Sequence, residues 1–348
     1  MDMKNVQGYL TAAWAACYAV LGVIWALGGP GFPFGYGDPD PGVRDSTVLG
    51  RLGAEAGGPV IAVLGLTGAA AALVMARSAR PARWIIGAGW AYGVLLIAVI
   101  QDMRPLVAIG RALELPILWP LGYAKSISVT DYLPWPVLNL FSCLAGGTLF
   151  VATAIRASRR RRQACPGCGR TGGHDHGLTT RAGAARWGVW AVWVAAVIPV
   201  LYALTRWAWF LGIPFGFSAA ELKAIGAEAP GIWLAGALLG SFGVGGSILT
   251  LGLVQRWGEV FPRWMPGLRG KRVPIKLAVI PATVVGLAVI AAGNTMIISF
   301  FRHLGDPAHL AIIGPSVLWP LWGLALIGAA YAYYLRRRPA CVTCHQNV

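Results

Sequence analysis

Long runs of apolar residues alternate with short polar or charged segments along the whole chain. Eight of these runs have a length that can cross a bilayer as a helix, about 20 residues. They lie near residues 8–28, 58–76, 84–101, 134–155, 187–211, 231–254, 274–297 and 313–335. The pattern therefore predicts an all-α membrane protein with eight transmembrane helices. We expect the first run to be a retained span, because Leu21–Leu27 continues into Gly and Pro without the small-residue pattern of a signal-peptide cleavage site.

Six short segments of the first half recur in the second half, in the same order and at offsets of roughly 173 to 200 residues. The pairs are Pro33–Tyr36 with Pro214–Phe217, Gly53–Gly58 with Gly226–Gly231, Pro81–Trp84 with Pro262–Trp264, Gly93–Met103 with Gly286–Met296, Ile117–Leu121 with Val317–Leu321, and Arg160–Cys168 with Arg336–Cys344. A duplicated unit of four spans inserts twice in the same orientation. The repeats are then parallel and related by an approximate two-fold axis along the membrane normal.

This duplication predicts four parts of the chain. Residues 1–156 form a first four-helix transmembrane repeat, and residues 157–185 form a basic linker with a cysteine knuckle. Residues 186–335 form the second four-helix repeat, and residues 336–348 form a tail with a second cysteine pair.

The charge distribution predicts the orientation in the membrane. Apolar residues make up 57% of the chain, charged residues only 12%, and the formal net charge is +16. One side of the membrane receives both termini and the loops between spans 2 and 3, 4 and 5, and 6 and 7. That side holds 21 of the 29 Lys and Arg but only three acids, Asp2, Asp175 and Glu259. Since basic loops stay in the cytoplasm, we expect a multi-pass protein of the bacterial plasma membrane with both termini inside. Anionic lipids then account for the basic excess, and no nucleic-acid partner is needed.

Four cysteines in the predicted cytoplasmic segments form the clearest candidate site. Cys165-Pro-Gly-Cys168 is a knuckle, and Cys341-Val-Thr-Cys344 is its counterpart in the second half. Zinc is held by four ligands in a tetrahedron, so each pair alone supplies half of a site. If the two-fold axis brings the pairs together, they form one closed and therefore structural zinc site that clamps the linker to the tail.

Alternatives for these cysteines stay open at this point. They include reduced thiols on flexible tails and reserve ligands from the histidines, which are His174, His176 and His345. Cys-Val-Thr-Cys-His345 also fits a c-type haem attachment motif, but attachment takes place outside the cytoplasm. A disulfide is disfavoured in that compartment. Cys17 and Cys143 lie inside spans and are expected to pack as small apolar residues.

Polar residues near the opposite face are candidates for substrate binding. Glu55 and Glu228 occupy matching positions, each expected at the start of a span, and Asp102 and Asn294 lie near the ends of matching spans. Stabilisation of a helix N-terminus explains a carboxylate equally well, whereas polar groups that face a bundle interior are often functional.

The outer loops add two further expectations. Ser218-Ala-Ala-Glu221 predicts a capping box that starts a short helix, expected to end near Gly226. The outer loop at 102–133, which includes Tyr123 and Tyr132, is the best candidate for contact with a substrate because of its length.

One short motif resembles a known family. Trp25-Ala26-Leu27-Gly28-Gly29, at the end of the first span, resembles an uncharacterised bacterial family of four-span membrane proteins. The matching residues Trp209–Ile213 depart from the motif. The resemblance implies a four-span unit, here duplicated, and it carries no activity to transfer.

Three function classes follow. The first is a transporter or permease-like protein for a small molecule, with its site between the repeats. The second is a non-transporting scaffold or sensor that docks a cytoplasmic protein through its basic, metal-clamped face. The third is a membrane enzyme that acts on a lipid or quinone. No Walker lysine loop, His-Glu-x-x-His motif or nucleophile elbow is present in the sequence, so the chain is not assigned as an enzyme.

Overall fold

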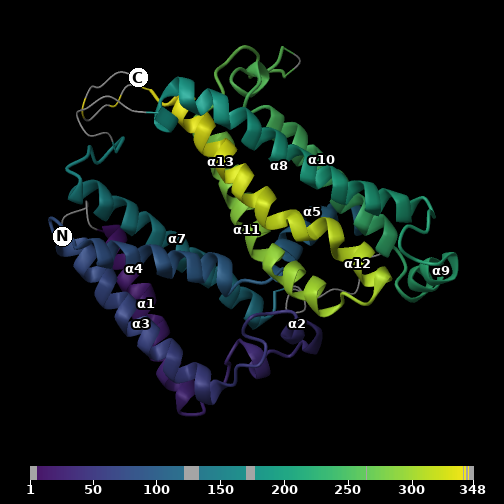
Figure 1. The fold of residues 1–348 in the computed structure, drawn as a ribbon, viewed down its shortest axis with the longest axis horizontal. Coiled ribbons are helices and arrows are strands. Elements are labelled where there is room, and N and C mark those ends of the chain that lie inside the picture. Colours follow the sequence, from purple (N-terminus) through teal and green to yellow (C-terminus); the bar gives the residue numbers. More distant parts are fainter. Residues whose placement is uncertain are drawn as a thin grey trace. The chain divides into compact units, whose positions relative to one another are not determined.

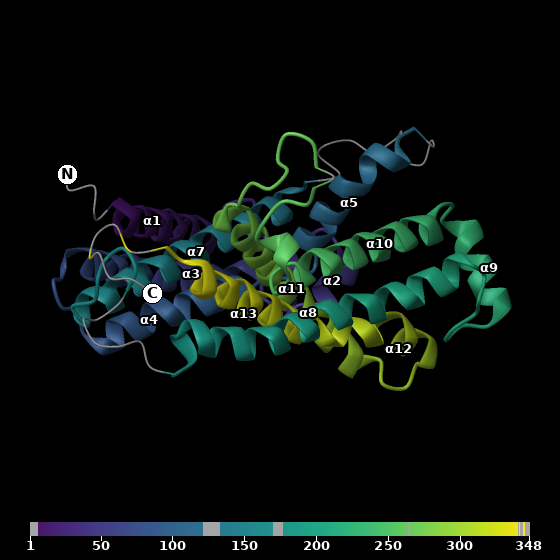
Figure 2. The same ribbon diagram turned by 90° about the horizontal axis from the view of Figure 1, so that it is seen from above.

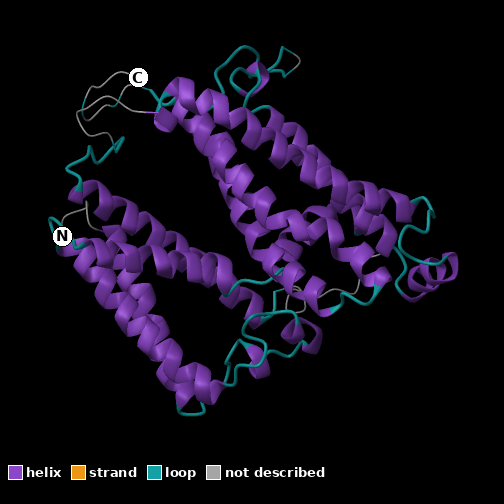
Figure 3. Cartoon of the chain, in the orientation of Figure 1, coloured by secondary structure: helices purple, strands orange, loops and turns teal. Residues whose placement is uncertain are grey.

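The computed structural model describes residues 6–120, 133–169, 177–263, 265–339, 341 and 344. These residues form helices joined by loops, with no strand among them apart from one isolated bridge between Val260 and Arg272 (Figure 3). The all-α prediction is therefore confirmed for the described residues.

Seven helices in the described part are long and apolar enough to cross a membrane. They are α1 (Val6–Ala26), α3 (Ala54–Arg77), α7 (Trp135–Arg161), α8 (Arg181–Phe210), α10 (Ile232–Leu251), α11 (Ile275–Arg302) and the stretch His309–Arg337, which ends in α13 (Trp319–Arg337). An eighth span is counted if Arg83–Val99 and Arg104–Ile117 cross together. Multi-pass membrane insertion is thus supported, with seven or eight spans.

The predicted third span does not run as one regular helix. It begins as α4 (Arg83–Val94) and continues as the π-helical turn Leu95–Val99. A short break follows, and α5 (Arg104–Leu118) begins after Met103. A π-helical turn replaces the usual i to i−4 hydrogen bonds with i to i−5 bonds. The polar residues Gln101 and Asp102 follow this turn, so the span predicted to end at residue 101 ends close to the observed position. Hydropathy does not reveal the π-helical turn itself.

The chain divides into two compact units. The first unit comprises residues 1–102, 133–175 and 340–347, and the second comprises 103–132, 176–339 and 348. In the first unit α1 packs along α3 and against α7, and α4 packs on α7 (Figure 1). In the second unit α8 packs along α10 and against α13, and α11 packs on α13 (Figure 2).

Small residues let the helices of each pair approach closely. A Cβ at Gly65 would lie 2.5 Å from the Ala19 backbone nitrogen, and a Cβ at Gly22 would overlap the backbone of Ala62. In a lipid environment, where the hydrophobic effect does not drive helices together, such close backbone packing is a main source of association. The α1–α3 contact is therefore a backbone-to-backbone interface.

Shorter helices lie between the spans or, in the case of α12, at the start of one. They are α2 (Pro41–Asp45), α9 (Ala219–Glu228) and α12 (Pro307–Ile313). The predicted capping box is present at α9: Ser218 accepts from the Glu221 N–H and Glu221 accepts from the Ser218 N–H, at 3.2 and 2.7 Å. The Ser218 N–H lowers the pKa of the Glu221 carboxyl, because it bonds to the ionised form. The box starts α9 where the sequence predicts it, and the helix runs two residues beyond Gly226.

Candidate metal centre

The end of α7 leads directly into the first cysteine pair. The helix ends at Arg161, and Gln163 adopts a left-handed conformation with φ of 53°. The backbone N–H groups of Gln163 and Ala164 donate to the carbonyls of Arg160 and Arg159, at 3.0 and 2.8 Å. This pattern is a Schellman ending. It closes the helix four residues before Cys165, and the left-handed Gln163 fixes the direction of the chain there.

The knuckle that follows is held by backbone and side-chain bonds. The Gly169 N–H donates to the Cys165 carbonyl at 2.8 Å, and Gly169 has a φ of +78°, a conformation that glycine adopts at little cost. Arg159 Nη1 donates to the carbonyls of Pro166 and Gly167, at 2.9 and 3.3 Å. With its carbonyls bound to Arg159, the turn directs backbone N–H groups toward the cysteine sulfur.

The second cysteine pair meets the first within the first unit. Cys165 Sγ lies 3.7 Å from Cys341 Sγ, and Cys168 Sγ lies 3.6 Å from Cys344 Sγ. All four sulfurs lie within 4.8 Å of one another. A tetrahedral Zn²⁺ with four Zn–S bonds of ~2.3 Å separates its sulfurs by roughly 3.8 Å. The Cys165–Cys341 and Cys168–Cys344 edges already have about this length, and any other edge needs a contraction of at most about 1 Å.

The four cysteines are free, partly buried thiols. A disulfide requires sulfurs about 2.0 Å apart, so the observed separations belong to unbonded sulfurs. The backbone N–H of Cys168, followed by that of Gly167, lowers the pKa of the Cys165 thiol by bonding to the thiolate, and the Cys341 side chain acts in the opposite direction. The thiolate is the form that binds metal.

The donor set fits a metal ion of known preference. Four sulfurs in a tetrahedron are the ligands of structural zinc or of iron. The prediction that the two pairs form one group able to hold a metal is confirmed by this geometry. His174, His176 and His345, the predicted reserve ligands, lie outside the described residues.

No protein-family model, curated protein or solved structure matches this chain. The resemblance of Trp25–Gly29 to a four-span family therefore stays a prediction.

The two predicted carboxylates Glu55 and Glu228 have different settings. Glu55 lies in the first turn of α3 and is exposed, as the sequence predicts for a helix start.

Glu228 is the last residue of α9, and α10 begins only at Ile232. The expectation that Glu228 starts a span is wrong. Pro230 and Gly231, with a φ of +88°, separate the two helices. Glu228 is exposed at a helix C-terminus, where the helix dipole disfavours a carboxylate.

Asp102 is placed differently from these two glutamates. It is 2% exposed at the break that follows the π-helical turn, and its neighbour Gln101 is 3% exposed. Gln101 Nε2 donates to the carbonyls of Leu96 and Leu140, at 2.9 and 3.0 Å, and thereby ties the break to α7. A buried carboxylate directly after the π-helical turn is the strongest polar candidate of the four.

Asn294 lies within α11 in the second unit and is partly buried beside Thr295, which is 3% exposed. Asp102 and Asn294 belong to different units. The predicted contact loop at 102–133 is wrong in its first part, because α5 (Arg104–Leu118) forms a helix there. Tyr123 and Tyr132 lie outside the described residues.

Two residues that support the metal centre are not apparent from the sequence. Arg159 stands there only as one member of a run of positive charge, although it binds the knuckle carbonyls. Gly169 directly follows Cys168 in the sequence, and apart from this position nothing there indicates its conformational role. No sequence signal distinguishes Arg159 from Arg160, Arg161 and Arg162.

Proposed function

We propose that this chain is a multi-pass membrane protein with a structural zinc centre, in which Cys165, Cys168, Cys341 and Cys344 fasten the segment after α13 to the segment after α7. The observation that carries the proposal is the sulfur tetrad, with all four Sγ atoms within 4.8 Å. Four thiolates leave no open position for a reacting water. The ion therefore acts as a cross-link between segments 176 residues apart in sequence.

We also propose that the two four-helix groups are duplicated units. The third and fourth helices of each group cross at a pair of glycines: Gly93 faces Gly147 in one, and Gly286 faces Gly323 in the other. A Cβ at Gly147 would lie 3.2 Å from the Gly93 carbonyl, and a Cβ at Gly286 would lie 2.9 Å from the Gly323 carbonyl. These pairs fall on the offsets that relate the matching sequence segments.

Arginines at the end of the fourth helix support the same proposal. Arg161 donates to the carbonyl of Pro81 at 3.1 Å, and Arg337 donates to the carbonyl of Val273 at 3.0 Å. Both acceptors lie two residues before the third helix of their group. The preceding arginines, Arg160 and Arg336, bind carbonyls at or just beyond the end of the second helix, those of Met75 and Leu253. The shared contacts favour a common ancestor for the two groups.

A permease-like activity for a small cationic molecule is a second proposal, supported by Asp102. Transporter sites are commonly formed where a span is interrupted and a polar side chain is buried. Asp102 and Gln101 meet both conditions at the break after Val99. The scaffold alternative is supported by the exposed cations of the basic segments. The enzyme alternative has no such support, because the described residues contain no assembled catalytic group.

The zinc proposal is tested by metal analysis of the full chain purified in detergent under reducing conditions. We expect about one zinc per chain and, after exchange with Co²⁺, the intense visible absorption of tetrahedral thiolate coordination. Cys341→Ser and Cys165→Ser should each lower the zinc content at least tenfold. Cys17→Ser is the matched control, because Cys17 is an exposed thiol within α1. Preparations without metal, or with iron in its place, would contradict the proposal.

A further inference from the structure

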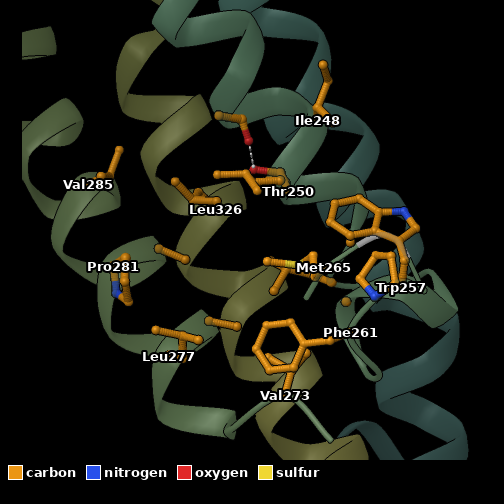
Figure 4. A pocket seen from close by; sticks show the side chains of 18 of the residues that line it. Ile248, Thr250, Trp257, Phe261, Met265, Val273, Leu277, Pro281, Val285 and Leu326 are labelled. Atoms are coloured by element: carbon orange, nitrogen blue, oxygen red, sulfur yellow. Dashed lines mark hydrogen bonds between the residues drawn. The ribbon is translucent and has the colours of Figure 1, made fainter. Parts of the chain in front are cut away.

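The second unit contains an apolar cavity of about 660 Å³ that the metal centre does not involve. Its walls come from the carboxyl end of α10, the amino-terminal half of α11, α13 and the segment 252–273. Figure 4 shows Trp257, Phe261 and Met265 of that segment facing Leu277 of α11 and Leu326 of α13 across the space. The volume lies in the range of sites that bind organic molecules.

The cavity offers an occupant almost no hydrogen bonds. Thr250 Oγ1 already donates to the Gly246 carbonyl at 2.8 Å, and Trp257 Nε1 already donates to Gln255 Oε1. The indole of Trp322 is the other lining side chain with a polar hydrogen, and the rest are aliphatic, aromatic or the thioether of Met265. A ligand with buried polar groups would lose their hydration without compensation. The occupant is therefore a hydrocarbon chain or a group of similar polarity.

Positive charge borders the same cavity. Four exposed cations each adjoin a lining residue in the sequence: Arg256 precedes Trp257, Arg263 follows Pro262, Arg272 precedes Val273 and Lys276 precedes Leu277. The segment 252–276 contains one acid, Glu259, whose carboxylate pairs with Arg336 at 3.4 Å. The segment that lines the cavity is thus strongly positive, and this charge matches an anionic headgroup.

The location of the cavity fits an amphiphile. Gly246, Leu249 and Thr250 are among the last residues of α10, a candidate span, and the cations follow directly after its end. A ligand that fills the cavity would place its apolar part at the depth of the helix end and its polar part at the membrane surface. Phospholipids have this division of polarity.

The two groups of helices differ at this place. Five residues, 78–82, connect α3 to α4, whereas residues 252–274 connect α10 to α11. The longer connection supplies Trp257, Phe261 and Met265 to the cavity wall. The insertion therefore builds a binding surface in the second unit that a five-residue turn cannot provide.

From these observations we propose that the cavity binds one acyl chain of an anionic phospholipid, with the lipid phosphate held by the cations of the 252–276 segment. The site is independent of the zinc centre, which belongs to the other unit. Binding of the lipid depends on the filling of the apolar space and on the charge of the 252–276 segment. These two features can be changed separately.

The apolar part is tested with a matched pair of neighbouring glycines. A Cβ at Gly246 or at Gly245 would meet nothing within 4 Å, but only Gly246 lines the cavity. The full chain is placed in nanodiscs that contain phosphatidylglycerol with a photoreactive diazirine on one acyl chain. We expect labelled peptides from 252–285, a loss of that labelling of at least fivefold in Gly246→Leu, and wild-type labelling in Gly245→Leu. Melting temperatures of both variants show whether each is folded.

The charge at the border is tested with the double variant Arg256→Gln/Arg263→Gln against the control Arg80→Gln/Arg83→Gln, which removes two exposed arginines at the start of α4. In the wild type, phosphatidylglycerol should label 252–285 at least fivefold more than phosphatidylcholine with the same diazirine chain. The first double variant should remove this preference, and the control should keep it. Equal labelling by the two lipids in the wild type, or equal labelling of Gly246→Leu and Gly245→Leu, would overturn the proposal. A neutral isoprenoid that copurifies in the cavity would overturn it as well.

Discussion

Gly169 meets two constraints at the metal centre. Its φ of +78° is a conformation that costs other residues roughly 1–2 kcal/mol. A Cβ added there would also lie 3.0 Å from Arg159 Nε. Since Arg159 binds the carbonyls of Pro166 and Gly167, crowding at Gly169 would disturb the turn that presents Cys165 and Cys168.

We therefore expect Gly169→Ala to weaken zinc binding about tenfold, since 1.4 kcal/mol corresponds to a factor of ten. The measurement is competition for zinc with a chromophoric chelator. Gly177→Ala is the control: Gly177 has a φ of +67°, but a Cβ there would meet nothing within 4 Å. If the two variants lose affinity equally, the Arg159 contact has no part in holding the knuckle.

At the scale of the elements, the α1–α3 pair depends on glycine more than on large side chains. Gly22 and Gly58 each allow the partner backbone to come closer than a Cβ would permit. Gly22→Ala should lower the free energy of unfolding by about 1–3 kcal/mol, because the added methyl group forces the helices apart.

Thermal unfolding in detergent, followed by circular dichroism, checks this expectation. Gly87→Ala is the matched control, because Gly87 lies in α4 and a Cβ there meets nothing within 4 Å. Alanine also has the better helix propensity, so this variant should melt at or slightly above the wild-type temperature. A similar loss in both variants would argue against backbone contact between α1 and α3.

The sequence predicts the spans well, because a bilayer forces apolar segments to satisfy their own backbone bonds as helices. The limits of the spans are less predictable. The break before Met103 depends on a π-helical turn, and the setting of Glu228 depends on how far α9 extends. Hydropathy ends the third span near residue 101, but it reveals neither the π-helical turn nor the length of α9.

For the candidate site, the ligand residues are predictable and their supports are not. Cysteine spacing alone is enough to identify Cys165, Cys168, Cys341 and Cys344. The role of Arg159 arises from the Schellman ending of α7, which turns the chain back toward that side chain. The apolar cavity is not predictable from the sequence either. The many charges of segment 252–276 indicate a polar loop, although Trp257, Phe261 and Met265 lie between them.

For the whole molecule, the sulfur tetrad constrains the membrane topology. Cys168 and Cys344 are 3.6 Å apart, so the chain between them must begin and end on the same side of the membrane. That requires an even number of crossings. The described part of this stretch contains four candidate spans, which are Arg181–Phe210, Ile232–Leu251, Ile275–Arg302 and His309–Arg337. The metal site and the span count therefore agree.

The permease proposal is tested by uptake of radiolabelled methylamine, a small cation, into proteoliposomes that hold the full chain. Asp102→Asn should reduce the uptake at least tenfold, because it removes the buried carboxyl group on which the proposal rests. Asp40→Asn is the control, since Asp40 is an exposed acid outside the spans. Wild-type protein that folds, holds zinc and shows no uptake above empty liposomes would contradict the permease proposal and leave the zinc proposal intact.

The distance in sequence between the two cysteine pairs has a consequence for biosynthesis. The ribosome releases Cys165 and Cys168 long before Cys341 and Cys344, and four candidate spans have to enter the bilayer in between. A nascent chain can offer an ion only two sulfurs until that insertion is complete. Capture of the metal by all four thiolates would then be a late maturation event, and chains that stall or insert incorrectly would keep exposed, reactive thiols that quality-control proteases and chaperones can recognise.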